Sequence, residues 1–238
     1  MRSGLAYFKE VYDIVPGWVQ KMHDYRPELL ECYTSLRGGI MSDSALTRKE
    51  KDILLVGMNA ARLYERSMLY HTKGAIDAGA TIPELVEYLM VPYLYNGAKA
   101  LNTAMKSLEY ALSLQGKRNS VSIKNDGTME ELLIQIIQLM DGEDTTFIEG
   151  ALSLLRSERD DLLIEKIMDD AVVSRKMKQL LMVGIFITEL KGQQAGIWME
   201  TARENGASEE ELADVGFICL LTAGIPAWFE ASDSLAEK

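Results

Sequence analysis

The chain repeats itself at an offset of 127 residues, the separation of Gly79 from Gly206. At this offset the segment TRKEKDILLVG (47–57) aligns with SRKMKQLLMVG (174–184), and AIDAGATIPEL (75–85) aligns with ARENGASEEEL (202–212). The register needs no gap from residue 47 onward. A fixed internal repeat of this length indicates a tandem duplication, so both halves are expected to adopt the same fold.

Both halves have the sequence pattern of helices. Apolar residues recur at steps of three and four, and strand-like alternation is nearly absent. We therefore expect an all-α fold made of two tandem helical repeats, with about five or six helices in each. The repeats are predicted to span 1–114 and 129–238. The segment QGKRNSVSIKNDGT (115–128) is rich in Ser, Asn, Gly and charge, which predicts a linker.

Helix ends are marked in both halves. Capping-box patterns predict helix starts at three places: Thr47 with Glu50, Thr81 with Glu84, and Ser208 with Glu211. Gly79 and Gly206 stand where the preceding helices should end, because glycine readily takes the left-handed conformation that closes a helix.

The charge balance restricts the partners. With 25 basic and 36 acidic residues the net charge is -11, and no basic block appears, which argues against a nucleic-acid or anionic-membrane partner. No apolar run reaches the roughly 18 residues that span a bilayer. The first residues also lack the apolar core of a signal peptide. These features predict a cytoplasmic protein.

The chain has two cysteines, Cys32 and Cys219, which are far apart and lie in apolar segments. They do not form a CxxC pair. We expect buried free thiols rather than a disulfide.

His71 is the strongest candidate for chemistry among the two histidines. On a helix, Ser67 lies one turn before it and Tyr64 two turns before it, on the same face. Two hydroxyl groups beside a histidine can hold it in one tautomer, as a general acid or base requires. A core histidine with local hydrogen bonds is the alternative interpretation. No second ligand pattern surrounds His71, so neither a metal nor another cofactor is predicted.

The segment TRKEKDILLVGMNAARLYERSMLYHTKGAIDAGATIPELVEYLMVPYLYNGAKALNTA (47–104) resembles the carboxymuconolactone decarboxylase and alkylhydroperoxidase-D superfamily. The resemblance rests on the histidine eight residues before the Gly-Ala turn, the acidic helix after that turn, and the later Asn-Gly. The peroxidase branch carries an acidic residue, a CxxC pair and a histidine. These positions fall on Asp52, on Tyr64 and Ser67, and on His71. Peroxide reduction by a thiol pair is thus excluded here.

The decarboxylase branch also lacks the thiols and keeps the histidine. The resemblance implies that His71 moves the proton, with Asp52 or Glu65 orienting it. It also implies that Tyr64, Ser67 or Arg66 holds the anionic group of the substrate. The sequence leaves open whether Asp52 contacts His71.

The second half has lost this set of residues. The positions of Asp52, Tyr64, Ser67 and His71 are taken, in that order, by Gln179, Lys191, Gln194 and Trp198. One candidate site per chain is therefore predicted. Single-domain members of the superfamily assemble into rings, so the resemblance implies a homo-oligomer, with a homotrimer as the leading expectation.

Three functions remain open at this stage. The first is a cysteine-free lyase of the decarboxylase or isomerase type, acting on a small anionic organic acid or lactone through His71. The second is a non-catalytic binding or assembly protein. The third is an antioxidant that uses Cys32 or Cys219, which the missing CxxC pair disfavours.

Overall fold

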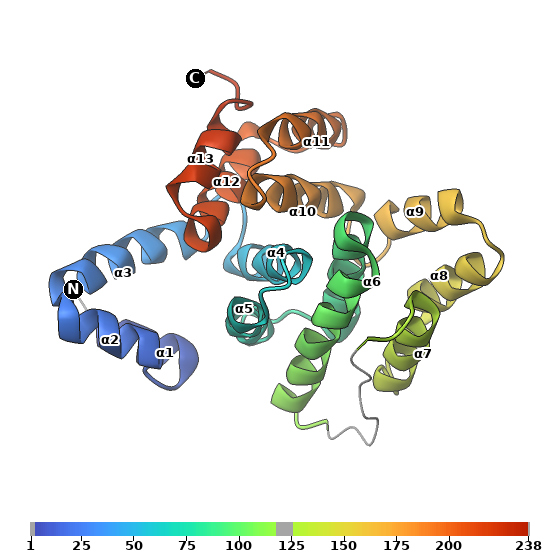
Figure 1. Cartoon of the computed structure of the whole chain (residues 1–238), viewed down its shortest axis with the longest axis horizontal. Coiled ribbons are helices and arrows are strands. Elements are labelled where there is room, and N and C mark those ends of the chain that lie inside the picture. The colour runs from blue at the N-terminus through green and yellow to red at the C-terminus, as the bar shows by residue number, and fades with distance from the viewer. Residues whose placement is uncertain (1–2, 118–125, 238) are drawn as a thin grey trace.

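The computed structural model describes residues 3–117 and 126–237, and these residues form 13 helices and no strand (Figure 1). The predicted all-α fold is confirmed. The helices are α1 (Gly4–Tyr12), α2 (Gly17–Tyr25), α3 (Pro27–Met41), α4 (Arg48–Ala61), α5 (Glu65–Asp77), α6 (Ile82–Leu114), α7 (Met129–Leu139), α8 (Thr146–Arg156), α9 (Asp160–Met168), α10 (Arg175–Thr188), α11 (Gly192–Glu204), α12 (Glu209–Ala223) and α13 (Ile225–Ser232).

The helix bounds recur at the offset of 127 residues. α4 corresponds to α10 and α5 to α11, residue for residue at both ends. All three predicted capping boxes are formed, at the starts of α4, α6 and α12. Gly97, with φ of 58°, interrupts α6, and Gly224, with φ of 79°, separates α12 from α13. The backbone thus breaks at matching positions in the two halves.

The predicted linker is only partly described. α6 ends at Leu114 and α7 begins at Met129, and residues 118–125 of the linker lie outside the described residues. No helix in the described ranges is both long enough and apolar enough to cross a membrane.

The two halves meet where α4 crosses α10. A Cβ atom at Gly57 would lie 2.5 Å from the side chain of Leu181, and one at Gly184 would lie 2.0 Å from that of Met58. The two glycines therefore let the helices approach closely. Around the crossing, buried side chains of both halves form one continuous hydrophobic core.

Two of the ion pairs that join the halves are related to each other by the offset of 127 residues. Lys178 Nζ lies 2.9 Å from Glu87 Oε2, with both side chains almost completely buried. Lys51 Nζ lies 3.3 Å from Asp214 Oδ2. Each lysine comes from the first turn of α4 or α10, and each acid comes from the opposite half. The halves are thus held together by reciprocal contacts.

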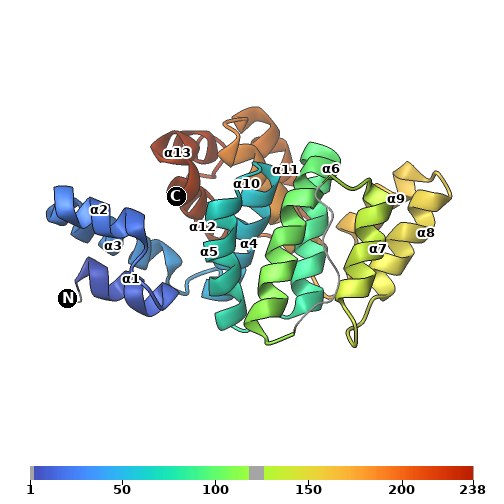
Figure 2. The same ribbon diagram turned by 60° about the horizontal axis from the view of Figure 1, so that its bottom comes forward.

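The outer helices lie at opposite ends of this body, with α1–α3 at one end and α7–α9 at the other (Figure 2). α1 contacts α5 and α3 contacts α12, whereas α7 and α9 both contact α6. α1–α3 have a small aromatic core of their own, centred on Phe8. A space lined by side chains from α1–α3, α5 and α12 is therefore formed beside α5.

Candidate active site

His71 and Asp52 form a buried hydrogen-bonded pair. The two atoms, Nδ1 of His71 and Oδ1 of Asp52, lie 2.7 Å apart. The other carboxylate oxygen of Asp52 accepts a hydrogen bond from Nε of Arg48, one turn earlier on α4. An ionised carboxylate can only accept, so Nδ1 of His71 carries the proton. The lone pair of Nε2 then remains for chemistry.

The glycine one turn after His71 makes this pair possible. A Cβ atom at Gly74 would lie 2.5–2.9 Å from the three carboxyl atoms of Asp52, closer than any real contact. The carboxylate of Asp52 therefore occupies the space that a side chain at position 74 would fill. In the second half the corresponding residue is Thr201, which has a side chain there.

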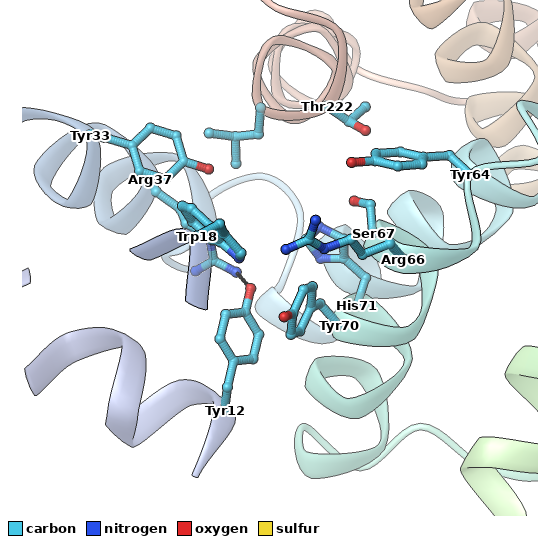
Figure 3. Close-up of a pocket in the computed structure, with 11 residues that line it drawn as sticks. Tyr12, Trp18, Tyr33, Arg37, Tyr64, Arg66, Ser67, Tyr70, His71 and Thr222 are labelled. Atoms are coloured by element: carbon cyan, nitrogen blue, oxygen red, sulfur yellow. Dashed lines mark hydrogen bonds between the residues drawn. The ribbon is translucent and has the colours of Figure 1, made fainter. Parts of the chain in front are cut away.

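His71 forms part of the wall of a cavity of about 300 Å³ between α5 and the N-terminal helices (Figure 3). Side chains from three parts of the fold line it: Tyr12, Trp18, Tyr33 and Arg37 from the α1–α3 segment, Tyr64, Arg66, Ser67, Tyr70 and His71 at α5, and Leu221 and Thr222 from α12. The hydroxyl groups of Tyr33 and Tyr64 point into the cavity from opposite sides. The volume suits one small molecule.

The side chains that line the cavity carry a net positive charge, whereas the chain as a whole is negatively charged. Two arginines line it and no acidic residue does, although the chain has 36 acidic and 25 basic residues. Arg37 is buried, and Arg66 is exposed at the start of α5. A cavity that presents guanidinium and hydroxyl groups without carboxylates is complementary to an anion.

The protonation states follow from burial and from neighbouring charges. Burial lowers the pKa of His71; the hydrogen bond to Asp52 opposes this shift, and the positive charges of Arg37 and Arg48 add to it. His71 is therefore neutral at pH 7. Burial alone would raise the pKa of Asp52, but His71 and Arg48 outweigh it and hold the pKa below its usual value. Burial also raises the pKa of Tyr12 to about 12, so its hydroxyl stays neutral.

The structure brings most of the predicted site residues together. Tyr64, Arg66, Ser67 and His71 line the cavity, and Asp52 lies behind His71. We had expected Tyr64 to lie within the helix, but α5 begins one residue later, at Glu65. Leu63, with a φ of 58°, precedes this start.

Two expectations need correction. Glu65 does not line the cavity, and its carboxylate pairs with Lys106 instead. The reason is geometric, because Glu65 precedes His71 by six residues, and this spacing places the two side chains on different faces of the helix. Cys32 is exposed and only Cys219 is buried, although both thiols are free. Cys32 lies on α3, whose outward face also carries the exposed residues Leu29 and Leu36.

Sequence reasoning missed the residues that lie outside the repeated segment. Tyr12, Trp18, Tyr33 and Arg37 precede residue 47, where the repeat begins. The one sequence feature that could have indicated them is the concentration of tyrosines and arginines within an otherwise amphipathic segment. Within the described ranges, no three His, Cys, Asp or Glu side chains are placed to hold a metal ion.

In the second half, the residue that corresponds to Asp52 has no hydrogen-bond donor for its side-chain oxygen among the described residues. Gln179, which corresponds to Asp52, is 4% exposed, and its Oε1 atom has no hydrogen bond. Trp198 stands in place of His71. A buried acceptor without a donor destabilises the fold.

Replacing Gln179 with methionine is therefore expected to stabilise the protein. The change removes the unpaired acceptor and keeps the volume, so the free energy of unfolding should rise by about 1 kcal/mol, and the melting temperature by about 2–4 °C. Thermal and urea unfolding measure both quantities. The matched control is Gln194→Met, at an exposed position of α11, which should change little. A loss of stability in Gln179→Met would show that the amide is paired in solution.

The comparisons with known proteins agree with this fold. The family model described as "Carboxymuconolactone decarboxylase family" matches residues 27–110. No curated protein matches the chain. A Burkholderia xenovorans LB400 structure, provisionally described as a gamma-carboxymuconolactone decarboxylase subunit, is 19% identical, with a TM-score of 0.60 over 96% of this chain and 93% of that one. A second structure from the same organism, provisionally a carboxymuconolactone decarboxylase, is 24% identical, with a TM-score of 0.43 over 49% of this chain and 94% of that one.

Residues 27–110 are therefore similar to the carboxymuconolactone decarboxylase family, and the chain as a whole shares the fold of the first of these structures. The matched residues, 27–110, contain Asp52, His71 and all the helix α5. The first half thus carries both the family pattern and the candidate site.

Proposed function

We propose that this protein transfers a proton at His71 on a small anionic organic acid or lactone, in a reaction of the decarboxylase or isomerase type. The observation that carries the proposal is the buried His71–Asp52 pair, 2.7 Å apart, in the wall of a cavity with two arginines and no acidic side chain. A neutral imidazole oriented by a carboxylate is a general base suited to neutral pH.

The chemistry follows from the free nitrogen of His71. In an isomerisation, Nε2 takes a proton from a carbon next to a carbonyl group and returns it to another carbon of the conjugated system. In a decarboxylation, the electron pair of the breaking C–C bond enters the conjugated system as CO₂ leaves, and Nε2 delivers a proton from solvent to the carbon. Both routes place negative charge on an oxygen atom. Tyr64, Ser67 and Arg66 line the cavity, and we assign to their hydroxyls and guanidinium the stabilisation of that charge.

The thiols offer no support for an antioxidant role. Cys219 is fully buried, and burial raises the pKa of its thiol far above the usual value. A reactive cysteine needs an accessible thiolate. Cys32 is exposed but has no cysteine partner.

The homotrimer and the cytoplasmic location remain predictions, and proton transfer at His71 requires neither.

A screen in D₂O tests the proposal directly. Small carboxylates, keto acids and unsaturated lactones are incubated with the protein, and NMR follows deuterium incorporation and loss of the carboxylate. We expect at least one anionic compound to exchange a proton or release CO₂. Binding without any turnover across the panel would instead support the non-catalytic binding protein.

The pH dependence of the reaction identifies the base. Burial lowers the pKa of His71 below its usual value, so the imidazole stays neutral down to lower pH than an ordinary histidine. For the isomerisation, in which Nε2 acts as the base, kcat/KM should therefore be constant through neutral pH and fall as pH decreases, with a midpoint below about 6.5. A rate profile between about pH 4.5 and 8.5 measures this midpoint. Activity that first appears above about pH 7 would contradict His71 as the base.

A further inference from the structure

Arg37 is a buried cation without a carboxylate partner. Its side chain, on α3, is 3% exposed, and no acidic oxygen among the described residues lies within ion-pair distance of it. Its guanidinium donates hydrogen bonds to the hydroxyls of Tyr7, at 2.6 Å, and Tyr12, at 3.0 Å. Both acceptors are tyrosine hydroxyls, and a guanidinium has five N–H donors. Arg37 thus has no carboxylate paired with it directly, although the nearby charge of Asp52 helps to raise its pKa, and its remaining donors have no hydrogen bond among the described residues.

An unpaired buried charge at a cavity points to a ligand. Burying a cation is costly unless a counter-charge accompanies it, and buried arginines are therefore normally paired. The guanidinium of Arg37 lies 5.6–5.7 Å from the ring centroids of Tyr7, Phe8 and Tyr12, which offsets part of this cost. It also lines the cavity beside His71. An anionic ligand group there would supply a direct ion pair to Arg37.

The walls around Arg37 are flat and aromatic. Tyr12, Trp18, Tyr33 and Tyr70 all line the cavity, and Trp18 and Tyr33 lie together on the α1–α3 side (Figure 3). The buried ring of Phe8 supports three of them from behind, with centroid distances of 5.9 Å to Tyr12, 5.1 Å to Trp18 and 6.1 Å to Tyr33. Packing of this kind holds the rings in fixed orientations.

The contact between α1 and α5 extends the aromatic wall to His71. The rings of Tyr12 and Tyr70 lie 4.6 Å apart, and Tyr70 immediately precedes His71. Aromatic faces therefore run from Arg37 to the catalytic nitrogen. Arg66 is different, because it is exposed and belongs to the first turn of α5.

We infer that the ligand of this cavity is a small carboxylate on a flat, conjugated frame, with its carboxylate on Arg37 and its π faces against the aromatic side chains. The inference rests on the proposed function and specifies its substrate class. A planar guanidinium matches a carboxylate with two parallel hydrogen bonds. Flat rings stack on aromatic side chains better than puckered ones. Arg37 is thereby a specificity-determining residue that sequence reasoning did not identify.

Titration calorimetry on the wild type tests the two parts of the inference separately. The probes are benzoate, benzamide, cyclohexanecarboxylate and sorbate. Benzoate should bind at least tenfold more tightly than benzamide, which lacks the charge, and than cyclohexanecarboxylate, which lacks the flat ring. Sorbate as tight as benzoate would support the conjugated class broadly, and weaker sorbate would support its aromatic members. Equal binding of benzoate and benzamide, or of benzoate and cyclohexanecarboxylate, would overturn the inference.

Variants then assign the charge to Arg37. Arg37→Met should weaken benzoate binding at least tenfold, while the matched change Arg66→Met should weaken it less. Near-UV circular dichroism of the aromatic cluster checks that the variant folds. If Arg37→Met fails to fold, Arg37→Lys keeps the charge but loses the paired donors, and it should still weaken benzoate binding severalfold. A folded Arg37→Met, or an Arg37→Lys, with unchanged affinity would overturn the assignment.

The inference and the proposed function can fail separately. His71→Asn should slow proton exchange by about 10²–10⁴-fold and still bind benzoate. Selective benzoate binding through Arg37, with no proton exchange on any acid, would defeat the proposed function alone. Proton exchange that depends on His71 but not on Arg37 or on a flat frame would defeat this inference alone.

Discussion

Replacing His71 with asparagine is expected to lower kcat by about 10²–10⁴-fold, the usual contribution of a positioned general base. An asparagine amide can still donate a hydrogen bond to Asp52, so the buried carboxylate keeps a partner. The amide cannot accept a proton at neutral pH, however, and proton transfer therefore stops. Steady-state kinetics on the compound found in the D₂O screen measures the effect.

The chain supplies a matched control for this change in its other histidine. His23 lies on α2 and does not line the cavity, so His23→Asn should leave kcat unchanged. Urea unfolding of both variants separates a loss of chemistry from a loss of folding. A His71→Asn variant that folds and retains kcat within about threefold would exclude His71 as the base.

The second large effect concerns stability. Glu87→Gln is expected to lower the free energy of unfolding by about 3–5 kcal/mol, because it leaves Lys178 charged and buried without a counter-charge. The carboxylate of Glu87 also accepts hydrogen bonds from the backbone N–H groups of Val172, at 2.9 Å, and Val173, at 3.0 Å. Chemical denaturation of wild type and variant measures the loss.

An exposed ion pair provides the comparison. Glu65 and Lys106 also form an ion pair, but their side chains are 45% and 38% exposed. Glu65→Gln should therefore cost less than about 1 kcal/mol. In the double variant Glu87→Gln, Lys178→Met, part of the stability should return, since no charge is left unpaired. If Glu87→Gln and Glu65→Gln were equally mild, the halves would not be joined by the buried pair.

Local features of the sequence predicted the fold well. Thr47, Thr81 and Ser208 each begin a helix through a capping box, as expected, because caps depend on residues within one turn. Gly79 has a φ of 90° at a helix end, also as expected. The helix over Gly17–Tyr25 was not anticipated, since it is short and mostly polar and follows a proline.

The candidate site could be predicted only along one helix. Ser67 and His71 share a face of α5 because of their spacing, which the sequence displays directly. The position of Arg37 depends on how α3 packs against the rest of the molecule, and no local pattern encodes such packing. Glu65 was assigned a role by family resemblance, and the packing of α5 against α6 directs it to Lys106 instead.

Most of the side chains that line the cavity come from two separate stretches of chain. Arg37 and the rings of Tyr12, Trp18 and Tyr33 belong to residues 4–41, whereas Tyr64, Tyr70 and the His71–Asp52 pair belong to residues 48–77. Residues 4–41 have their own small core and precede the segment that the two halves share. On the proposed function, substitutions at the aromatic positions of this first stretch would change which acids are admitted and would leave His71, Asp52 and the charge of Arg37 in place. The architecture allows new substrate ranges to evolve, or to be engineered, within a single continuous segment.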